Sequence, residues 1–297
     1  MRKSILTATA ALLLSSTMAS AADLDREIGL IVSGVVDKWA GVQFIDDGID
    51  DDTVLASGGE GRLSLPLGSS VTAQMDAKYE YNSNAIENPA ANDVFGPRFN
   101  FQGTFHLSHR DPQSFLFGGL GGVGTASFGD NRYDVLFAGG EAQFYLDNIT
   151  LYAQGGLVDF DPQGPIIAPM DDGLFARGVV RWFPTNDSRL QLEGTYMNID
   201  LDGFADDVDI FSVKARYDFM MPSLPLIGAM PLFVQYRGTF RDNCNPGAQS
   251  VPTPGSLLDV DDHTFMIGSS YSFSGDLLTI DRQGATLDTP DFNHGCS

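Results

Sequence analysis

Residues 211–219 read FSVKARYDF, and apolar and polar side chains alternate through this stretch without a break. Successive side chains of a β-strand point to opposite sides, so the stretch has two distinct faces. One face is apolar with an aromatic residue near each end, and it consists of Phe211, Val213, Ala215, Tyr217 and Phe219. The opposite face is polar and charged, and it consists of Ser212, Lys214, Arg216 and Asp218.

The same two-residue period recurs along the chain and predicts twelve strands. They span residues 28–45, 53–67, 70–82, 98–109, 114–126, 133–147, 149–160, 173–184, 188–200, 207–220, 231–242 and 262–273. These lengths are typical of strands that cross a membrane with an apolar outer face and a polar inner face. Outside the first 21 residues, no i, i+3, i+4 pattern of an amphipathic helix competes with them.

The connections between these segments fall into two alternating classes. One class is short and rich in Asp, Asn, Gly, Pro and Ser, as in tight hairpins, and it comprises 67–70, 110–114, 146–149 and 184–188. The other class is longer, and residues 221–231 are a long, apolar exception on the short side. Short turns on one rim and long loops on the other favour an outer-membrane barrel over a water-soluble β-sandwich, which also alternates.

The N-terminus and the overall charge narrow the class of protein further. Arg2 and Lys3 precede a short apolar stretch, and Ala19-Ser20-Ala21 fits a cleavage site, so residues 1–21 are expected to be a signal peptide. The formal net charge is −22, and cleavage makes it more negative by two. Because phosphate binding needs clustered Lys and Arg, nucleic acid is not expected as a partner.

The end of the last segment resembles a known signal. Gly268, Tyr271 and Phe273 fit the barrel-assembly pattern of porin-like outer-membrane β-barrel proteins of Gram-negative bacteria, although Met266 stands where that pattern prefers a polar residue. The resemblance implies an all-β, up-and-down antiparallel transmembrane barrel of about 12 strands over residues 22–273. It also implies an outer-membrane location, contact with the lipid bilayer and lipopolysaccharide, and recognition by the barrel-assembly machinery through these three residues. The sequence leaves the oligomeric state open.

The inner faces of the expected strands carry a mixed set of charges. These candidate pore-lining residues are Lys78, Glu80, Glu141, Arg177, Arg181, Glu193, Lys214, Arg216, Asp218, Arg237 and Arg241. They predict a porin-like channel for passive diffusion of small solutes, with an anion preference from the arginines on three late strands. The alternative is a non-conducting structural barrel, in which the charges pair across strands or the chain's own C-terminal tail fills the lumen.

Catalysis, cofactors and metals find little support in the sequence. His106 and Ser108 share one strand face while His109 points the opposite way, so FHLSHR does not form a triad and no enzyme is expected. The longer loops are acidic, and carboxylates there either bind divalent cations or simply keep the rim solvated. No cofactor and no metal site is predicted.

Residues 274–297 continue past the last expected strand as an acidic tail. Extended, the tail is long enough to pass through the lumen, because a residue spans up to ~3.3 Å and the hydrocarbon layer is ~30 Å thick. The tail is either periplasmic or inserted in the lumen. We expect a Cys244–Cys296 disulfide, with free thiols or an intermolecular bond as alternatives. The glycines in FGGLGGVGT (117–125) allow strand curvature or close strand contact, or leave room in the lumen for another segment.

Overall fold

The computed structural model describes nine stretches of the chain. They are residues 31–46, 51–83, 98–128, 131–163, 170–201, 207–224, 228–244, 258–272 and 275–292. The expected signal peptide, Phe273 of the assembly pattern and Cys296 of the expected disulfide therefore lie outside the described residues.

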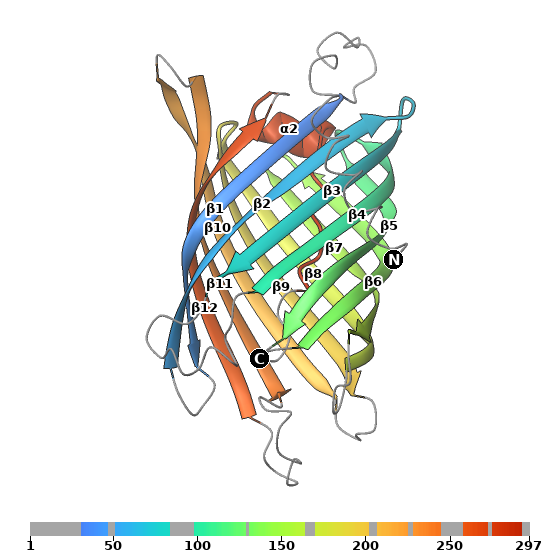
Figure 1. The fold of residues 1–297 in the computed structure, drawn as a ribbon. Coiled ribbons are helices and arrows are strands. Elements are labelled where there is room, and N and C mark those ends of the chain that lie inside the picture. The colour runs from blue at the N-terminus through green and yellow to red at the C-terminus, as the bar shows by residue number, and fades with distance from the viewer. Residues whose placement is uncertain are drawn as a thin grey trace, which may run out of the picture.

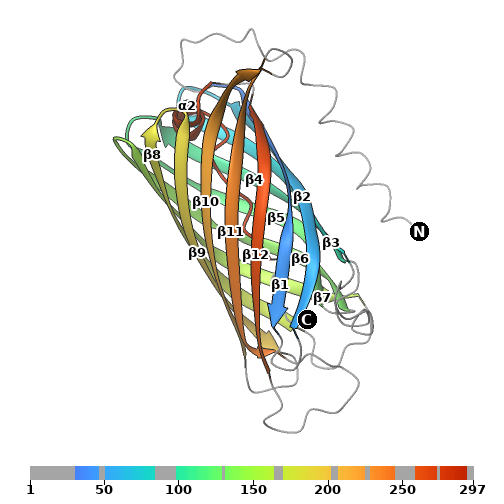
Figure 2. The ribbon, with the colours of Figure 1, turned by 90° about the vertical axis from the view of Figure 1, so that its left-hand side faces the viewer.

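Twelve antiparallel strands form one closed barrel, as the alternation predicts (Figures 1 and 2). The strands are β1 (Ser33–Asp46), β2 (Asp51–Pro66), β3 (Val71–Asn82), β4 (Arg98–Asp111), β5 (Phe115–Phe128), β6 (Asn131–Leu146), β7 (Ile149–Pro162), β8 (Met170–Thr185), β9 (Ser188–Leu201), β10 (Val208–Leu224), β11 (Gly228–Cys244) and β12 (Leu258–Ser272). Each strand pairs with its sequence neighbours, and β1 pairs with β12 along the closing seam. Closure leaves the sheet without an unpaired edge.

The outer surface is apolar and carries aromatic side chains toward both ends. Near the long-loop ends of their strands stand Phe44, Tyr81, Phe99, Tyr196 and Phe211, all exposed. Near the short-turn ends stand Phe117, Phe144, Trp182, Tyr217 and Tyr271, also exposed. An exposed apolar surface flanked by two aromatic girdles is the outer face of a barrel that sits in a lipid bilayer.

The short turns lie on one rim, where the strand ends meet closely. Leu146 pairs with Ile149, so Asp147 and Asn148 alone form that turn, and Asp147 has the positive φ of 47° that such turns require. The apolar exception at 221–231 has a simple geometric cause. β10 and β11 continue to Leu224 and from Gly228, so most of this stretch is a longer hairpin rather than a loop.

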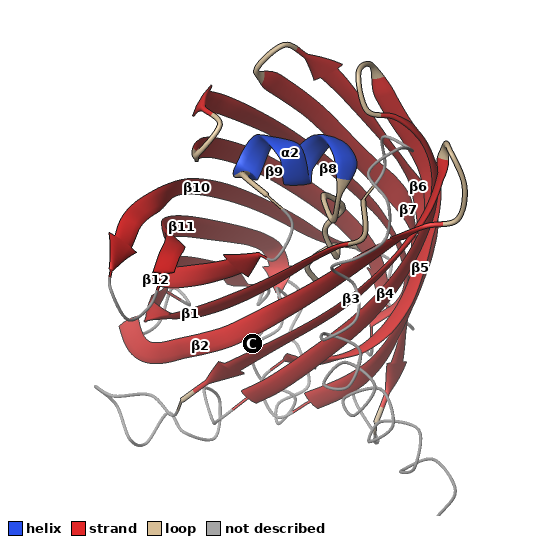
Figure 3. Ribbon diagram, turned by 90° about the horizontal axis from the view of Figure 1, so that it is seen from above, coloured by secondary structure: helices blue, strands red, loops and turns tan. Residues whose placement is uncertain are grey.

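A short helix that the sequence pattern did not indicate follows β12. Gly275 has a φ of 106°, and Asp276 caps the helix α2 (Leu277–Gln283) by accepting a hydrogen bond from the Thr279 N–H. The seven residues form only two turns, too few to produce a recognisable helical period. Figure 3, seen from above, shows α2 in the mouth of the barrel on the short-turn rim. No helix among the described segments is long and apolar enough to cross a membrane.

Candidate functional site: the charged interior of the barrel

The charged interior of the barrel is the candidate functional site. The strand alternation turns every predicted pore-lining side chain inward, and the exposed fraction of most of them is below 10%. These inward, buried residues are Lys78, Glu80, Glu141, Arg177, Arg181, Glu193, Arg216, Asp218, Arg237 and Arg241, while Lys214 is partly buried. A charge in such surroundings is stable only with a partner, because desolvation costs several kcal/mol per ion.

Some of the interior cations pair with acids of the barrel wall itself. Arg216 donates to Asp218 on its own strand and to Asp37 on β1, and Arg189 donates to Asp218 from the neighbouring strand. Arg241 pairs with Asp262 across the β11–β12 ladder. These pairs neutralise one side of the interior without help from any other segment.

A second group of ion pairs stands on β8, β9 and β10. Arg177 makes two hydrogen bonds of 2.8 and 2.9 Å to the Glu193 carboxylate, in a bidentate geometry. Lys214 reaches the same carboxylate at 2.7 Å. One acid therefore neutralises only part of the charge of two cations.

One wall pair spans the interior between strands that are not neighbours. Arg237 on β11 donates two hydrogen bonds, of 2.9 and 3.0 Å, to the Glu80 carboxylate on β3. β12, β1 and β2 lie between these two strands in the ring. The pair therefore crosses the interior as a chord instead of lying along the wall.

Residues 284–292 run from α2 into the barrel interior, and we call them the tail segment (Figure 1). At the short-turn rim, Arg110 donates to the Gly284 carbonyl at 2.7 Å, and Ser33 Oγ accepts from the Ala285 N–H at 2.7 Å. Deeper inside, the Gln74 side chain bonds both the N–H and the carbonyl of Leu287. The backbone of the tail segment thus finds fixed partners on the wall, as a buried backbone must.

Asp288 is the central charge of the tail segment. Its carboxylate lies 2.7 Å from Arg62, 2.5 Å from Arg181 and 3.2 Å from Arg177. Arg62 stands on β2 and the other two arginines on β8, six strands away in a ring of twelve. One carboxylate therefore connects opposite walls of the barrel.

Beyond Asp288, two further residues hold the tail segment. Asp291 lies 2.5 Å from Lys78 and 3.6 Å from Arg237. The Phe292 ring packs on Phe137 and Phe175, with centroid distances of 4.8 and 5.3 Å. The Phe137 ring in turn covers Gly122, where a Cβ would stand 2.3 Å from the ring, so this glycine makes room for the aromatic contact.

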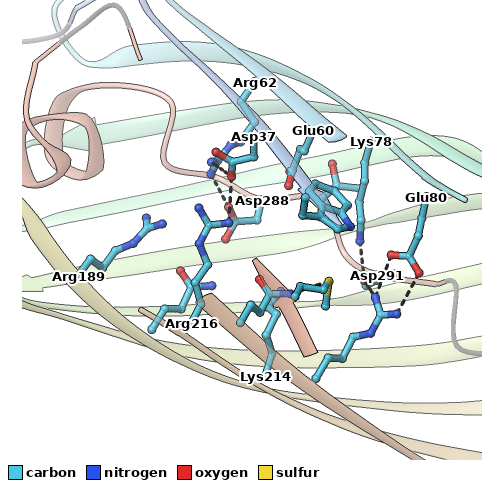
Figure 4. Close-up of a pocket in the computed structure, with 16 residues that line it drawn as sticks. Asp37, Glu60, Arg62, Lys78, Glu80, Arg189, Lys214, Arg216, Asp288 and Asp291 are labelled. Carbon is cyan, nitrogen blue, oxygen red and sulfur yellow. Dashed lines mark hydrogen bonds and ion pairs between the residues drawn. The ribbon is translucent and has the colours of Figure 1, made fainter. Parts of the chain in front are cut away.

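A small cavity remains between the tail segment and the wall (Figure 4). Its volume is about 50 Å³, room for only a few water molecules. Six cations line it, namely Arg62, Lys78, Arg189, Lys214, Arg216 and Arg237. The wall contributes three acids, Asp37, Glu60 and Glu80, and the tail segment contributes Asp288 and Asp291. Two further wall acids, Asp218 and Glu193, lie outside this lining and pair with Arg189, Arg216 and Lys214. The wall alone therefore carries only a small excess of positive charge.

Two smaller spaces of about 20 Å³ each lie along the interior beyond this cavity. Arg62 and Arg189 line both the cavity and the space nearer α2. Glu80 and Arg237 line both the cavity and the space nearer the long loops. Charged side chains therefore stand at each boundary between the spaces.

The residues of FHLSHR do not meet in a catalytic arrangement. His106 is fully buried, with its Nδ1 3.0 Å from Glu141 and its Nε2 3.1 Å from Asp76. Both ring nitrogens are thus engaged by carboxylates, and neither faces Ser108. His109 lies on the outer face, where its ring contacts Phe115 and Phe117.

Acidic clusters with metal-ligand spacing are confined, in the described part of the chain, to one group. Asp159, Asp171 and Asp172 place one oxygen each within 4.8 Å of one another, and all three are exposed. They face away from the barrel interior, on β7 and β8 near the long-loop rim. The group is separate from the charged interior.

Several interior residues escaped the sequence analysis. Arg62 and Glu60 lie on β2, where the glycines at 58, 59 and 61 interrupt the alternation. Asp37 lies on β1 two residues before Trp39, and both side chains face inward, so the inward face of that strand is not uniformly polar. The inward position of Asp37 could have been predicted only from the two-residue period of β1, because Val35, Gln43 and Ile45 lie on the same face.

Comparison with known proteins agrees with the architecture. No protein-family model and no curated protein sequence matches the chain. An outer-membrane channel from Pseudomonas putida F1 is similar over 84% of this chain and 100% of its own, with 11% identity and a TM-score of 0.53. This chain has the fold of an outer-membrane β-barrel protein. The resemblance inferred from the sequence is thereby confirmed at the level of fold.

Two further barrels show weaker similarity. The NanC porin matches over 80% of this chain and 98% of its own, with 12% identity and a TM-score of 0.44. The translocator domain of the autotransporter NalP from Neisseria meningitidis matches over 90% and 97%, with 12% identity and a TM-score of 0.43.

Proposed function

We propose that the protein is an outer-membrane channel for small, preferentially anionic solutes, which its own tail segment closes in the state described above. The observation that carries this proposal is the position of Asp288, which joins Arg62 on one wall to Arg177 and Arg181 on the opposite wall. Asp288 and the arginines around it stand in the interior that a solute would have to cross, where the spaces beside them measure only about 50 and 20 Å³. When the segment withdraws, the cations that held it line the path.

The charge balance supports the anion preference. The cavity wall has six cations and three acids, and the tail segment adds two acids. Asp218 and Glu193 also pair with these cations, so the wall has one cation more than acids without the segment and one fewer with it. Fields of one sign in a narrow, low-dielectric passage raise the local concentration of ions of the opposite sign.

A second candidate function is a barrel that never conducts and serves a structural role in the membrane. The backbone contacts of the tail segment with Gln74, Arg110 and Ser33 favour it, because they bind the segment independently of its charges. We infer a transport role in preference to this one because the wall retains an excess of cations that a purely structural interior does not require.

Single-channel recording in planar bilayers tests the proposal. The full-length wild type is compared with Asp288→Asn/Asp291→Asn, and Asp172→Asn serves as a control because it removes an exposed acid from the outer surface. Each charge-assisted hydrogen bond lost is worth about 1.5–3 kcal/mol, so the double variant should be open roughly tenfold more of the time or longer. Its reversal potential in a KCl gradient should indicate anion preference.

The outcomes separate the two candidates. A wild type that opens rarely, a double variant that opens often and a control that behaves as the wild type support a channel closed by its tail segment. Conductance at the empty-bilayer baseline in both the wild type and the double variant contradicts the channel and favours the structural barrel.

A further inference from the structure

The interior cations fall into two classes according to where their acids come from. Arg216, Arg189 and Arg241 pair with acids of the wall. Arg181 pairs instead with Asp281 and Asp288, both of which follow β12 in the sequence. Lys78 pairs with Asp291 of the tail segment. When the tail segment leaves the barrel, Lys78 loses Asp291, and Arg181 loses Asp288 but keeps Asp281 of α2. Arg62 and Arg177 also contact Asp288, and each keeps one wall acid, Asp37 or Glu193 respectively.

These cations form two separate anion-binding stations. Station one consists of Arg62, Arg177 and Arg181 around Asp288, and three guanidinium groups from opposite walls converge there on one carboxylate. Guanidinium groups bind planar carboxylates well, because their N–H donors match the spacing of the two oxygens.

Station two consists of Lys78 and Arg237 around Asp291, with Glu80 beside them. Two residues lie between Asp288 and Asp291, so the Cα atoms of the two acids are at most roughly 11 Å apart. The stations thus lie in series along the interior.

Both stations also keep donor groups that the tail segment does not use. Nε of Arg62 and Nε of Arg237 are buried and, within the described residues, without a hydrogen-bond partner. Both arginines line the cavity of about 50 Å³ beside the tail segment. A buried donor without an acceptor is destabilising, so each station can accept more anionic oxygen than the tail segment supplies.

We propose that the two stations are the binding site of small solutes that carry two carboxylates, and that Asp288 and Asp291 occupy it as built-in substitutes. This inference rests on the proposed function and names its solute class. A linear dicarboxylate of suitable length reaches both stations at once, as the tail segment does, whereas a monocarboxylate fills one. Solute and tail segment compete for the same cations.

Competition sets the concentration at which a solute enters. A ligand tethered by a short flexible linker has an effective concentration in the millimolar range. A free dicarboxylate must therefore reach roughly millimolar concentration to displace the tail segment of the wild type. Removing the two tail carboxylates should lower that concentration.

The cavity contains a natural reporter for a binding test that does not depend on conduction. Trp39 lines the cavity, and the other tryptophan of the chain, Trp182, is exposed on the outer surface. In a Trp182→Phe background, the fluorescence of Trp39 reports on the stations alone. The full-length protein in detergent micelles is titrated with suberate, acetate, inorganic phosphate and the cation 1,8-diaminooctane.

Four variants in this background give the test its controls. They are the unmodified Trp182→Phe chain, Asp288→Asn/Asp291→Asn, the same double variant with Arg181→Gln, and Asp172→Asn. We expect suberate to half-saturate the double variant at a concentration at least tenfold lower than in the unmodified chain. The added Arg181→Gln change should reverse most of that gain, and Asp172→Asn should have no effect.

The probes decide on the class of ligand. Suberate binding well ahead of acetate supports two stations in series, and equal binding of the two overturns the pairing of the stations. Phosphate that binds as tightly as suberate overturns the assignment to carboxylates. Equal half-saturation in the unmodified chain and the double variant, or equal binding of the diamine, overturns the inference altogether.

Failure of this inference is distinguishable from failure of the proposed function. Suberate binding without conductance supports the two stations and contradicts the proposed channel. If conductance rises in the double variant while Trp39 fluorescence does not respond to suberate, the channel is supported and the two stations are contradicted.

Discussion

Arg237 and Glu80 make two hydrogen bonds across the barrel interior, although β11 and β3 are separated by three strands in the ring. The same two residues line the spaces on both sides of them. The pair therefore separates two spaces of the interior and connects two strands that are not neighbours. Asp291 of the tail segment lies beside it.

Removing Arg237 and removing Glu80 should destabilise the barrel by different amounts. Removal of one partner of a buried ion pair typically costs about 3–5 kcal/mol, because a charge is left unpaired. Arg237→Gln leaves Glu80 without its hydrogen-bond partner, whereas Glu80→Gln leaves Arg237 next to Asp291. We expect the larger loss in the free energy of unfolding for Arg237→Gln, measured by urea unfolding in micelles.

The double variant Arg237→Gln/Glu80→Gln serves as the control. It should cost less than the sum of the single changes, because no charge stays unpaired. Additive effects would mean that the two residues do not interact in the folded barrel.

The N-cap of α2 should control how firmly the tail segment is attached at its start. Asp276 accepts from the Thr279 N–H at 2.7 Å, and loss of such a cap costs about 1 kcal/mol. Asp276→Ala should therefore raise the amide hydrogen exchange of residues 278–284 roughly fivefold, with the strands unchanged. Asp276→Ser retains a capping oxygen and should behave as the wild type; similar exchange in both variants would speak against the cap.

Two glycine-to-alanine substitutions should differ in their effect on stability. A Cβ at Gly122 would stand 2.3 Å from the Phe137 ring and 2.4 Å from the Gly103 carbonyl, whereas at Gly194 nothing lies within 4 Å. Overpacking costs about 1–3 kcal/mol, and open surface positions change stability by about 0.5 kcal/mol or less. Gly122→Ala should thus lower the unfolding free energy and Gly194→Ala should not.

The Gly122→Ala change should also weaken the hold on the tail segment. It displaces Phe137 from Phe292, so channel openings should become more frequent in planar bilayers. A variant with intact stability and unchanged openings would show that this aromatic contact holds nothing in place.

The Cys244–Cys296 disulfide stays a prediction, and the direction of the tail segment favours it. Phe292 belongs to the same buried cluster as Ile45, Val54 and Tyr133, which lie in the halves of their strands nearest the long loops. β11 ends at Cys244 on that rim. Peptide mapping without reductant should recover one linked pair of peptides, and reduction should increase channel opening; alkylation of both thiols in the unreduced protein would exclude the bond.

Most of the fold was predictable because its signal is local. Most strands show their period of two within their own residues, and turns such as Asp147-Asn148 have a typical turn composition. Residues and elements without a clear local pattern were not predicted. The glycines around Arg62 interrupted the pattern on β2, and the seven residues of α2 were too few to display a helical period.

The pairing of the interior charges had no local signal at all. Arg237 meets Glu80 over a separation of 157 residues, and Arg62 meets Asp288 over 226. Which inward charges face one another depends on the curvature of the closed sheet and on the presence of a further segment inside it. The sequence indicated an acidic tail and a basic wall. Only the folded structure shows which carboxylate pairs with which arginine.

The place of the tail segment has a consequence for how the protein is made. Residues 284–292 are synthesised after all twelve strands, yet their partners Arg62, Lys78 and Arg177 come from β2, β3 and β8. The surface that receives them exists only once the sheet has curved, so their entry is a late step of biogenesis. Until that step, the interior of a newly closed barrel lacks the carboxylates of Asp288 and Asp291, and Lys78 lacks its closest acidic partner.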